Sequence, residues 1–122
     1  MSKFNRFEDI IAWQKARVLV NDLYKIIDEV EKFKKDYNLK DQILRASFSI
    51  MLNIAEGFGR KSNKDFIHFL IIAHGSASEI QSALYIALDK KYINQTHFTS
   101  LYDEAGEISK MLMGLIKYLS KD

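Results

Sequence analysis

The segment of this sequence that most resembles a ligand-binding loop runs NIAEGFGRKSNKDF over residues 53–66. It contains Gly57 and Gly59, and its Lys61-Ser62 step resembles the end of a phosphate-binding loop. A loop of the Walker type needs G-x-x-x-x-G-K-[ST] between a strand and a helix. Here the two glycines are too close together and a helical pattern precedes them, so we interpret the segment as a turn between two helices.

The same segment carries the signals that end one helix and begin the next. Gly57 is predicted to take the left-handed conformation that commonly ends a helix. Ser62 followed by Asp65 forms a short version of the capping box that begins a helix. An anion could still bind at the N-terminus of the second of these helices, without making it a nucleotide site. The basic side chains around that position are Arg60, Lys61 and Lys64.

Composition places the chain among globular proteins. Its 122 residues, 48% hydrophobic and 28% charged, are enough to bury a core, and we expect one domain over residues 1–122. No apolar run approaches the roughly 20 residues that span a bilayer. The absence of cysteine excludes disulfides and thiolate metal sites. We therefore expect a cytoplasmic protein with no membrane partner, and the net charge of +2 neither indicates nor excludes nucleic-acid binding.

The spacing of apolar residues predicts an all-α protein. Proline is absent and glycine occurs only five times, so long helices can run without interruption. Apolar residues recur at steps of three and four, and no comparable stretch alternates with period two. The pattern predicts helices over roughly 8–32, 38–57, 63–90 and 95–120. Their short connections favour an antiparallel up-down-up-down four-helix bundle.

The predicted second helix is apolar on more than one face. Leu44, Phe48 and Leu52 extend its apolar surface beyond the single face that an outer helix of a monomeric bundle needs. We therefore predict that the chain associates with itself through these residues. The alternative is that they only widen the face directed at the chain's own core.

One narrow polar stripe runs along the same helix. If the helix is covered, the charged members of the stripe must be paired or reach solvent. Candidate partners on the third helix are Ser76 and Glu79. The stripe is either a hydrogen-bonded seam that fixes the register of two helices, which we favour, or a small polar pocket. Its members are Gln42, Arg45, Ser49, Asn53 and Glu56.

No arrangement of side chains predicts catalysis. A di-iron bundle needs two Glu-x-x-His motifs and further carboxylates, whereas this chain has a single Asp65-x-x-His68. No serine has the histidine and acid that a nucleophile triad requires. The acidic group Asp103, Glu104 and Glu107 is interpreted as a solvated helical face. We expect no enzyme activity, no cofactor, no metal and no small-molecule substrate.

Three segments give the sequence a family resemblance. They read FEDIIAWQKA from residue 7, QILRASFSIMLNIAEGFGR from residue 42 and DFIHFLIIAHGSASEI from residue 65. In these segments the chain resembles the small four-helix-bundle proteins encoded in intervening sequences of bacterial 23S ribosomal RNA genes. The resemblance extends over residues 7–119. Ser47 and Phe48 vary a stretch that is often richer in alanine. The positions that fit the family pattern are Trp13, Gln42, Arg45, Ser49, Asn53, Glu56, Gly57, Gly59, Arg60, Phe66, Phe69, Ala73, Ser76 and Glu79.

The resemblance implies a bundle that assembles into a ring, with a homopentamer as the family expectation. It also suggests a connection with RNA, although a gene inside an rRNA insertion shows where a protein is encoded and not what it binds. Distantly similar bundles serve as accessory factors of diversity-generating retroelements. The family brings no catalytic activity and no cofactor.

Basic residues are expected at both ends of the predicted bundle. One end groups the candidate nucleic-acid contacts Lys3, Arg6, Arg60, Lys61 and Lys64. The leading hypothesis is a non-enzymatic, ring-forming bundle associated with structured RNA or with an RNA-processing partner. The alternative is a protein-interaction scaffold without nucleic-acid binding. The opposite end of the bundle carries Lys32, Lys34, Lys35, Lys40, Lys90 and Lys91.

Overall fold

Four long helices and two short helical segments form the described part of the chain. The computed structural model describes residues 4–121. No strand occurs in these residues, so the prediction of an all-α bundle is confirmed. The elements are the 3₁₀ turn η1 (Phe7–Asp9), α1 (Ile11–Glu29), α2 (Glu31–Lys35), α3 (Tyr37–Phe58), α4 (Asn63–Asp89) and α5 (Gln95–Leu119).

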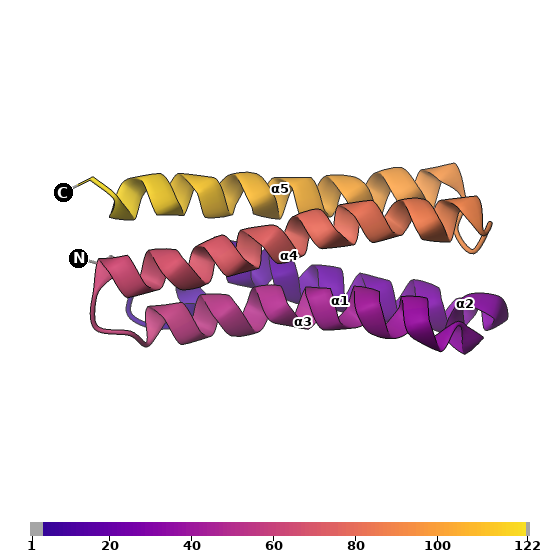
Figure 1. Cartoon of the computed structure of the whole chain (residues 1–122), viewed down its shortest axis with the longest axis horizontal. Helices are drawn as coiled ribbons and strands as arrows, with labels where there is room; N and C mark the ends of the chain where they lie inside the picture. The colour runs from indigo at the N-terminus through magenta and orange to yellow at the C-terminus, as the bar shows by residue number, and fades with distance from the viewer. Residues whose placement is uncertain (1–3, 122) are drawn as a thin grey trace.

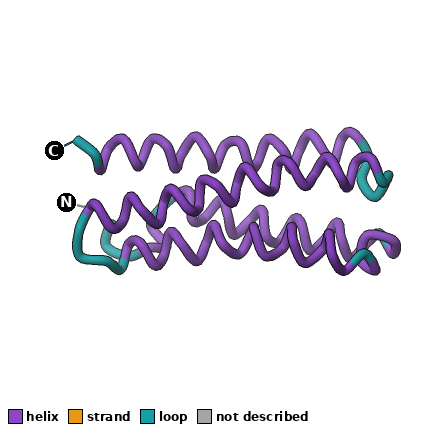
Figure 2. The backbone as a smooth tube through the Cα atoms, viewed as in Figure 1, coloured by secondary structure: helices purple, strands orange, loops and turns teal. Residues whose placement is uncertain are grey.

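The long helices lie side by side along one axis (Figure 1). Each of α1 and α4 packs against both α3 and α5. Both chain ends lie at the same end of the bundle as the turn between α3 and α4, which we call the turn end (Figure 2). The short α2 and the turn between α4 and α5 lie at the opposite end, which we call the α2 end.

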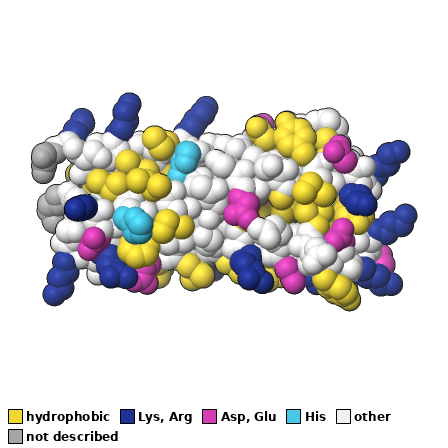
Figure 3. All heavy atoms as spheres, in the orientation of Figure 1, with side chains coloured by type: hydrophobic (Ala, Val, Ile, Leu, Met, Phe, Trp, Pro, Cys, Tyr) yellow, Lys and Arg dark blue, Asp and Glu magenta, His cyan; other side chains and the backbone are white. Residues whose placement is uncertain are grey.

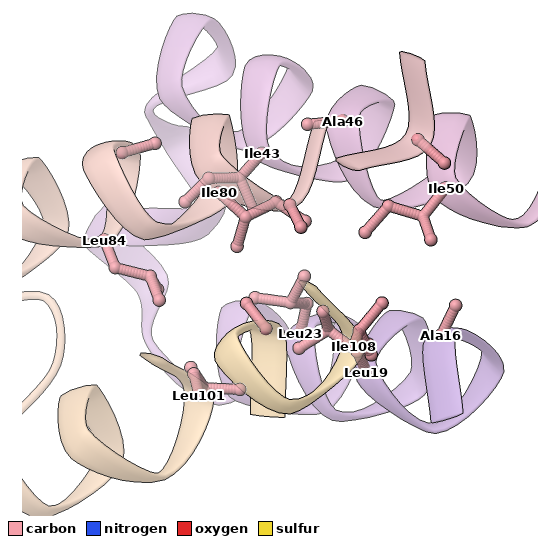
Figure 4. Close-up of a cluster of buried hydrophobic side chains, with 14 of the residues drawn as sticks. Ala16, Leu19, Leu23, Ile43, Ala46, Ile50, Ile80, Leu84, Leu101 and Ile108 are labelled. Carbon is pink, nitrogen blue, oxygen red and sulfur yellow. The ribbon is translucent and has the colours of Figure 1, made fainter. Parts of the chain in front are cut away.

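The core fills the space between the four long helices, as the apolar spacing predicts. Every helix contributes side chains that are at most 1% exposed, and Figure 4 shows several of them meeting at the centre of the bundle. In α4 the apolar residues that recur at steps of three and four are all buried, namely Phe66, Leu70, Ala73, Ala77, Ile80, Leu84 and Ala87. The central side chains are Leu19 and Leu23 of α1, Ile43 and Ile50 of α3, Ile80 and Leu84 of α4, and Leu101 and Ile108 of α5.

The first helix is shorter than its predicted span of 8–32. It ends at Glu29 because Val30 is extended, with φ −121° and ψ 103°. The chain then turns into α2, and this turn buries Phe33 to 1% exposure. The Phe33 ring stacks on Tyr92 at 5.2 Å between centroids. An unbroken helix would carry Phe33 past the end of the bundle, so burial of this ring favours the break.

The junction between α2 and α3 is held by one carboxylate. Asp36 caps α3 by accepting from the backbone N–H of Leu39 at 3.2 Å. It also accepts from the Tyr92 hydroxyl at 2.9 Å. The bond from Leu39, followed by the bond from Tyr92, lowers the pKa of Asp36. The bond from Tyr92 ties the start of α3 to the segment that follows α4.

Gly57 does not end α3 in the way the sequence suggested. It is buried inside the helix, and no glycine in residues 4–121 has a positive φ. The predicted left-handed conformation is therefore wrong. Helix α3 ends at Phe58, and its C-cap residue, Gly59, has a φ of −74°. Glycine is needed at residue 57 for space, because a Cβ there would lie 2.9 Å from Cδ1 of Phe66 and 2.9 Å from Cβ of Phe69.

A left-handed helix end occurs instead at the C-terminal end of α4. Lys91 has a φ of 64° and is the one non-glycine residue of the described chain with a positive φ. The N–H of Tyr92 donates to the carbonyl of Ala87 at 2.9 Å, and the N–H of Lys91 donates to that of Leu88 at 2.9 Å. This is the Schellman pattern. No residue type in this turn predicts it, because lysine does not favour a positive φ.

Candidate functional site

A row of hydrogen bonds joins α3 to α4 along their solvent side. The Ser76 hydroxyl donates to Ser49 Oγ at 2.7 Å. The Asn53 amide donates to the carbonyl of Ser49 at 2.8 Å and to its Oγ at 2.9 Å. Nearer the α2 end, the Gln42 amide donates to the Glu79 carboxylate. These bonds hold the two helices in one register.

Two members of the predicted stripe do not join this row. Glu56 pairs within its own helix end, accepting from Arg60 at 2.8 Å. Arg45 is exposed and lines a hollow on the α1 side of α3, beside Leu44 and Phe48. The stripe is therefore divided between a helix–helix contact and a surface hollow.

Two of the five candidate nucleic-acid contacts are held by nearby side chains. The Arg60 guanidinium bonds to Glu56 and lies 4.8 Å from the centroid of the Phe69 ring. Arg6 is 3.4 Å from the Glu8 carboxylate. The cationic charge of each arginine is thus partly balanced within the chain.

Lys61 and Lys64 are the two described candidates that have no acidic partner. Both are exposed, and neither has a carboxylate within 4.0 Å among residues 4–121. Between them, the Ser62 hydroxyl caps α4 by accepting from the N–H of Asp65 at 3.1 Å. The two lysines flank the N-terminus of a long helix, where anions are favoured. Lys3, also a candidate, lies outside the described residues.

The outer surface of α4 is nearly free of charge. From Phe66 to Leu88, Glu79 is the one Asp, Glu, Lys or Arg, and it is bonded to Gln42. Exposed fractions are 56% for Ile71, 39% for Ile72 and 51% for Ile86. Figure 3 shows hydrophobic side chains on this face, with lysine and arginine gathered toward its ends and edges. Exposed apolar surface of this kind marks interaction sites.

The three candidates for self-association occupy different environments. Leu44 is 7% exposed and belongs to the core of the single chain. Phe48 is half-buried and stacks on Tyr24, with ring centroids 6.1 Å apart. Leu52 is 67% exposed. The Ser49–Ser76 bond and the closeness of Gly57 to Phe69 place Leu52 roughly level with Ile72 along the axis of the bundle.

The acidic face predicted around Glu104 is not fully solvated. Oε1 of Glu104 is buried and has no hydrogen-bond partner among the described residues. Burial, followed by a hydrogen bond with Asp22 and the charge of Asp22, raises the pKa of Glu104 to about 7. The interpretation of Glu104 as a solvated residue is therefore wrong. No pattern in the sequence marks this burial, because it depends on Asp22 of a second helix.

The described residues contain no group of three histidine or acidic side chains arranged to hold a metal ion. His68, of the single Asp-x-x-His motif, is exposed and lies against the Phe69 ring at 5.4 Å between centroids. Within residues 4–121, no helix combines the length and hydropathy needed to cross a membrane.

Comparison with known proteins identifies relatives of this bundle. The family model described as 23S rRNA-intervening sequence protein matches residues 8–114. Among solved structures, a protein of unknown function from the S23 ribosomal protein family of Bacteroides thetaiotaomicron VPI-5482 has a TM-score of 0.80 and 28% sequence identity. That match covers 87% of this chain and 98% of the other. No curated protein matches the chain.

Proposed function

Because this chain belongs to the family of 23S rRNA-intervening sequence proteins, we propose that it is a non-catalytic bundle that assembles into a ring and contacts structured RNA. The observation that carries the proposal is the nearly uncharged outer surface of α4, together with the exposed Leu52 of α3. RNA contact is assigned to the turn end, through Lys61 and Lys64. A closed ring of five copies is the size that the family resemblance implies.

Assembly follows from the free energy of covering this surface. Burying an exposed isoleucine or leucine contributes roughly 1.5–3 kcal/mol. Leu52, Ile71, Ile72 and Ile86 are each at least 39% exposed. Their combined gain opposes the loss of rotational and translational freedom on association. In a ring this surface meets a different surface of the next copy, because head-to-tail contacts, unlike two-fold contacts, can close into a ring.

The proposed RNA contact depends on the repetition of Lys61 and Lys64 around the ring. A single pair of lysines binds phosphate weakly, but each copy in a ring adds another Lys61 and Lys64 to the same rim. Each phosphate that a lysine neutralises releases condensed counterions, so affinity should fall steeply with salt.

The assembly is tested by placing charge on the proposed contact surface. Leu52→Glu combined with Ile72→Glu should reduce the native mass to that of a monomer, because burying two unpaired carboxylates costs more than the contact gains. Native mass spectrometry and light scattering measure the result. Val18→Glu on α1, which is 53% exposed, is the matched comparison: an unchanged mass would show that charge on an exposed apolar residue does not by itself dissociate the ring, and a reduced mass would identify α1 as the surface that receives α4. An unchanged mass in the double variant would contradict the proposed contact surface.

The RNA contact is tested by reversing the charge of the turn end. Lys61→Glu with Lys64→Glu should weaken binding of a labelled RNA hairpin at least tenfold at low salt and flatten the salt dependence. Lys25→Glu with Lys110→Glu makes the same change in net charge elsewhere on the bundle and should have a much smaller effect. Equal losses in both variants would show that only net charge matters. Unchanged affinity in the first variant would remove the turn end as the RNA surface.

A second function, a protein-interaction scaffold without nucleic-acid binding, is favoured by the balanced charges at the turn end. Glu56 pairs with Arg60, and Glu8 pairs with Arg6. This function predicts an assembled wild-type protein that binds neither RNA hairpin nor duplex, even at low salt. The hairpin titration therefore separates the two proposals.

A further inference from the structure

A hollow of about 440 Å³ opens on the side of the bundle away from the outer surface of α4. It lies near the α2 end, where α1, α2 and α3 meet, and Tyr24 and Phe48 line it. We call it the Tyr24 hollow. Its volume lies within the roughly 300–1,000 Å³ of small-ligand sites. None of its lining residues belongs to the proposed assembly surface or to the turn end.

The wall of the Tyr24 hollow is aromatic and its floor is apolar. The rings of Tyr24 and Phe48 are inclined by only 27°, with centroids 6.1 Å apart. Tyr24 is nevertheless 42% exposed, so part of its ring remains open to a ligand. Ile27 and Leu44 beneath the rings are buried. Aromatic side chains with this exposure provide a surface on which a nucleobase can stack.

Charged side chains surround the aromatic wall without neutralising one another. Lys34, Lys40 and Arg45 line the hollow together with two carboxylates, Asp28 and Asp41. Lys40 also lies 4.9 Å from the centroid of the Tyr37 ring. Among residues 4–121, none of these five side chains has an opposite charge within 4.0 Å. Unpaired charges of both signs around an apolar floor leave donors and acceptors free for a ligand.

We propose that the Tyr24 hollow binds one unpaired nucleotide of an RNA. The base stacks against Tyr24 and Phe48, and the flanking phosphates lie against Lys34, Lys40 and Arg45. Asp28 and Asp41 accept hydrogen bonds from the amino groups of the base or from the 2′-hydroxyl. This inference rests on the proposed RNA function and adds to it a second contact that reads an unstacked base.

The mixture of charges favours a nucleotide over a simple anion. Inorganic phosphate would meet two carboxylates and would leave the aromatic wall unused. An unpaired nucleotide satisfies the cations, the carboxylates and the rings together. Arg45 and Gly59 are 14 positions apart along α3, which corresponds to about 21 Å at the helical rise of about 1.5 Å per residue. An RNA that contacts both sites must therefore present paired and unpaired nucleotides about 20 Å apart.

The test uses the full chain and a five-nucleotide single-stranded RNA with 2-aminopurine at its centre. Stacking quenches the fluorescence of this base, so binding in the Tyr24 hollow should give saturable quenching. Tyr24→Leu, which keeps an apolar side chain, should weaken binding about tenfold and reduce the quenching. Arg45→Gln should weaken binding and lower the slope of log affinity against log salt by about one.

Controls separate this inference from the function on which it rests. Tyr85→Leu removes another half-exposed ring, which packs on Phe98 at 4.8 Å, and should bind as the wild type does. Wild-type affinity in both Tyr24→Leu and Arg45→Gln, with helix content unchanged by circular dichroism, would overturn the hollow as a site. If Lys61→Glu with Lys64→Glu still abolishes binding of the RNA hairpin in that case, the proposed RNA function is retained and only the Tyr24 hollow is rejected. Failure of the wild type to bind either RNA would overturn both.

Discussion

Gly57→Ala is expected to destabilise the bundle by about 1–2 kcal/mol, although alanine is normally the better helix former. A methyl group at residue 57 would meet Phe66 and Phe69 at 2.9 Å. Overpacking of a filled core costs roughly 1–3 kcal/mol, and the higher helix propensity of alanine offsets only about 1 kcal/mol of that cost. The midpoint of urea unfolding should therefore fall without a change in slope.

A glycine in an open part of a helix supplies the control. Gly114 is exposed in α5, and a Cβ there would meet nothing within 4 Å. Gly114→Ala should raise the free energy of unfolding by about 0.5–1 kcal/mol. If the two substitutions changed stability equally, the close approach of α3 and α4 at Gly57 would not be a constraint.

Glu104→Gln is expected to stabilise the chain by about 1–2 kcal/mol above neutral pH. The pKa of Glu104 rises from an ordinary value of 4.5 to about 7 in the folded chain. Between these values the native state binds more protons than the unfolded state, so the free energy of unfolding falls as pH rises. Glutamine stays neutral in both states and removes this loss. The expected stabilisation is smaller than the full pKa shift would imply, because solvent reaches part of the Glu104 side chain.

The pH dependence makes the prediction specific. Urea unfolding from about pH 4.5 to about pH 8 should show a smaller decline in stability for Glu104→Gln than for the wild type. At the acid limit the two proteins should be nearly equal. Glu107→Gln is the control, because Glu107 is exposed and lies 3.6 Å from Lys15, and it should retain the wild-type decline. An identical decline in Glu104→Gln would show that Glu104 is not the titrating group.

Local features of this chain follow directly from its sequence. The positions buried along α4, from Phe66 to Ala87, recur at steps of three and four. The cap at Ser62 needs only a hydroxyl and the N–H of Asp65. Both features depend on residues within about one helical turn of each other, so a single sequence contains the information needed to predict them.

Features that depend on a second helix could not be predicted in the same way. Gly57 was assigned to the end of α3 because glycine often serves there, but its role comes from the proximity of Phe66 and Phe69. Glu104 carries no mark of burial until α1 brings Asp22 beside it. Arg45 shares a helical stripe with Ser49, yet it lines the Tyr24 hollow while Ser49 bonds to α4.

The helices of this protein, most of the residues that each helix buries and its family can therefore be inferred without the structure. The packing of the helices establishes where glycine is required, which carboxyl group loses solvent, and which basic residues have no acidic partner. The difference arises from distance along the chain. Helix formation and capping are interactions within a few residues of the chain, whereas close approach, desolvation and charge pairing depend on which side chains the neighbouring helices place within a few ångströms.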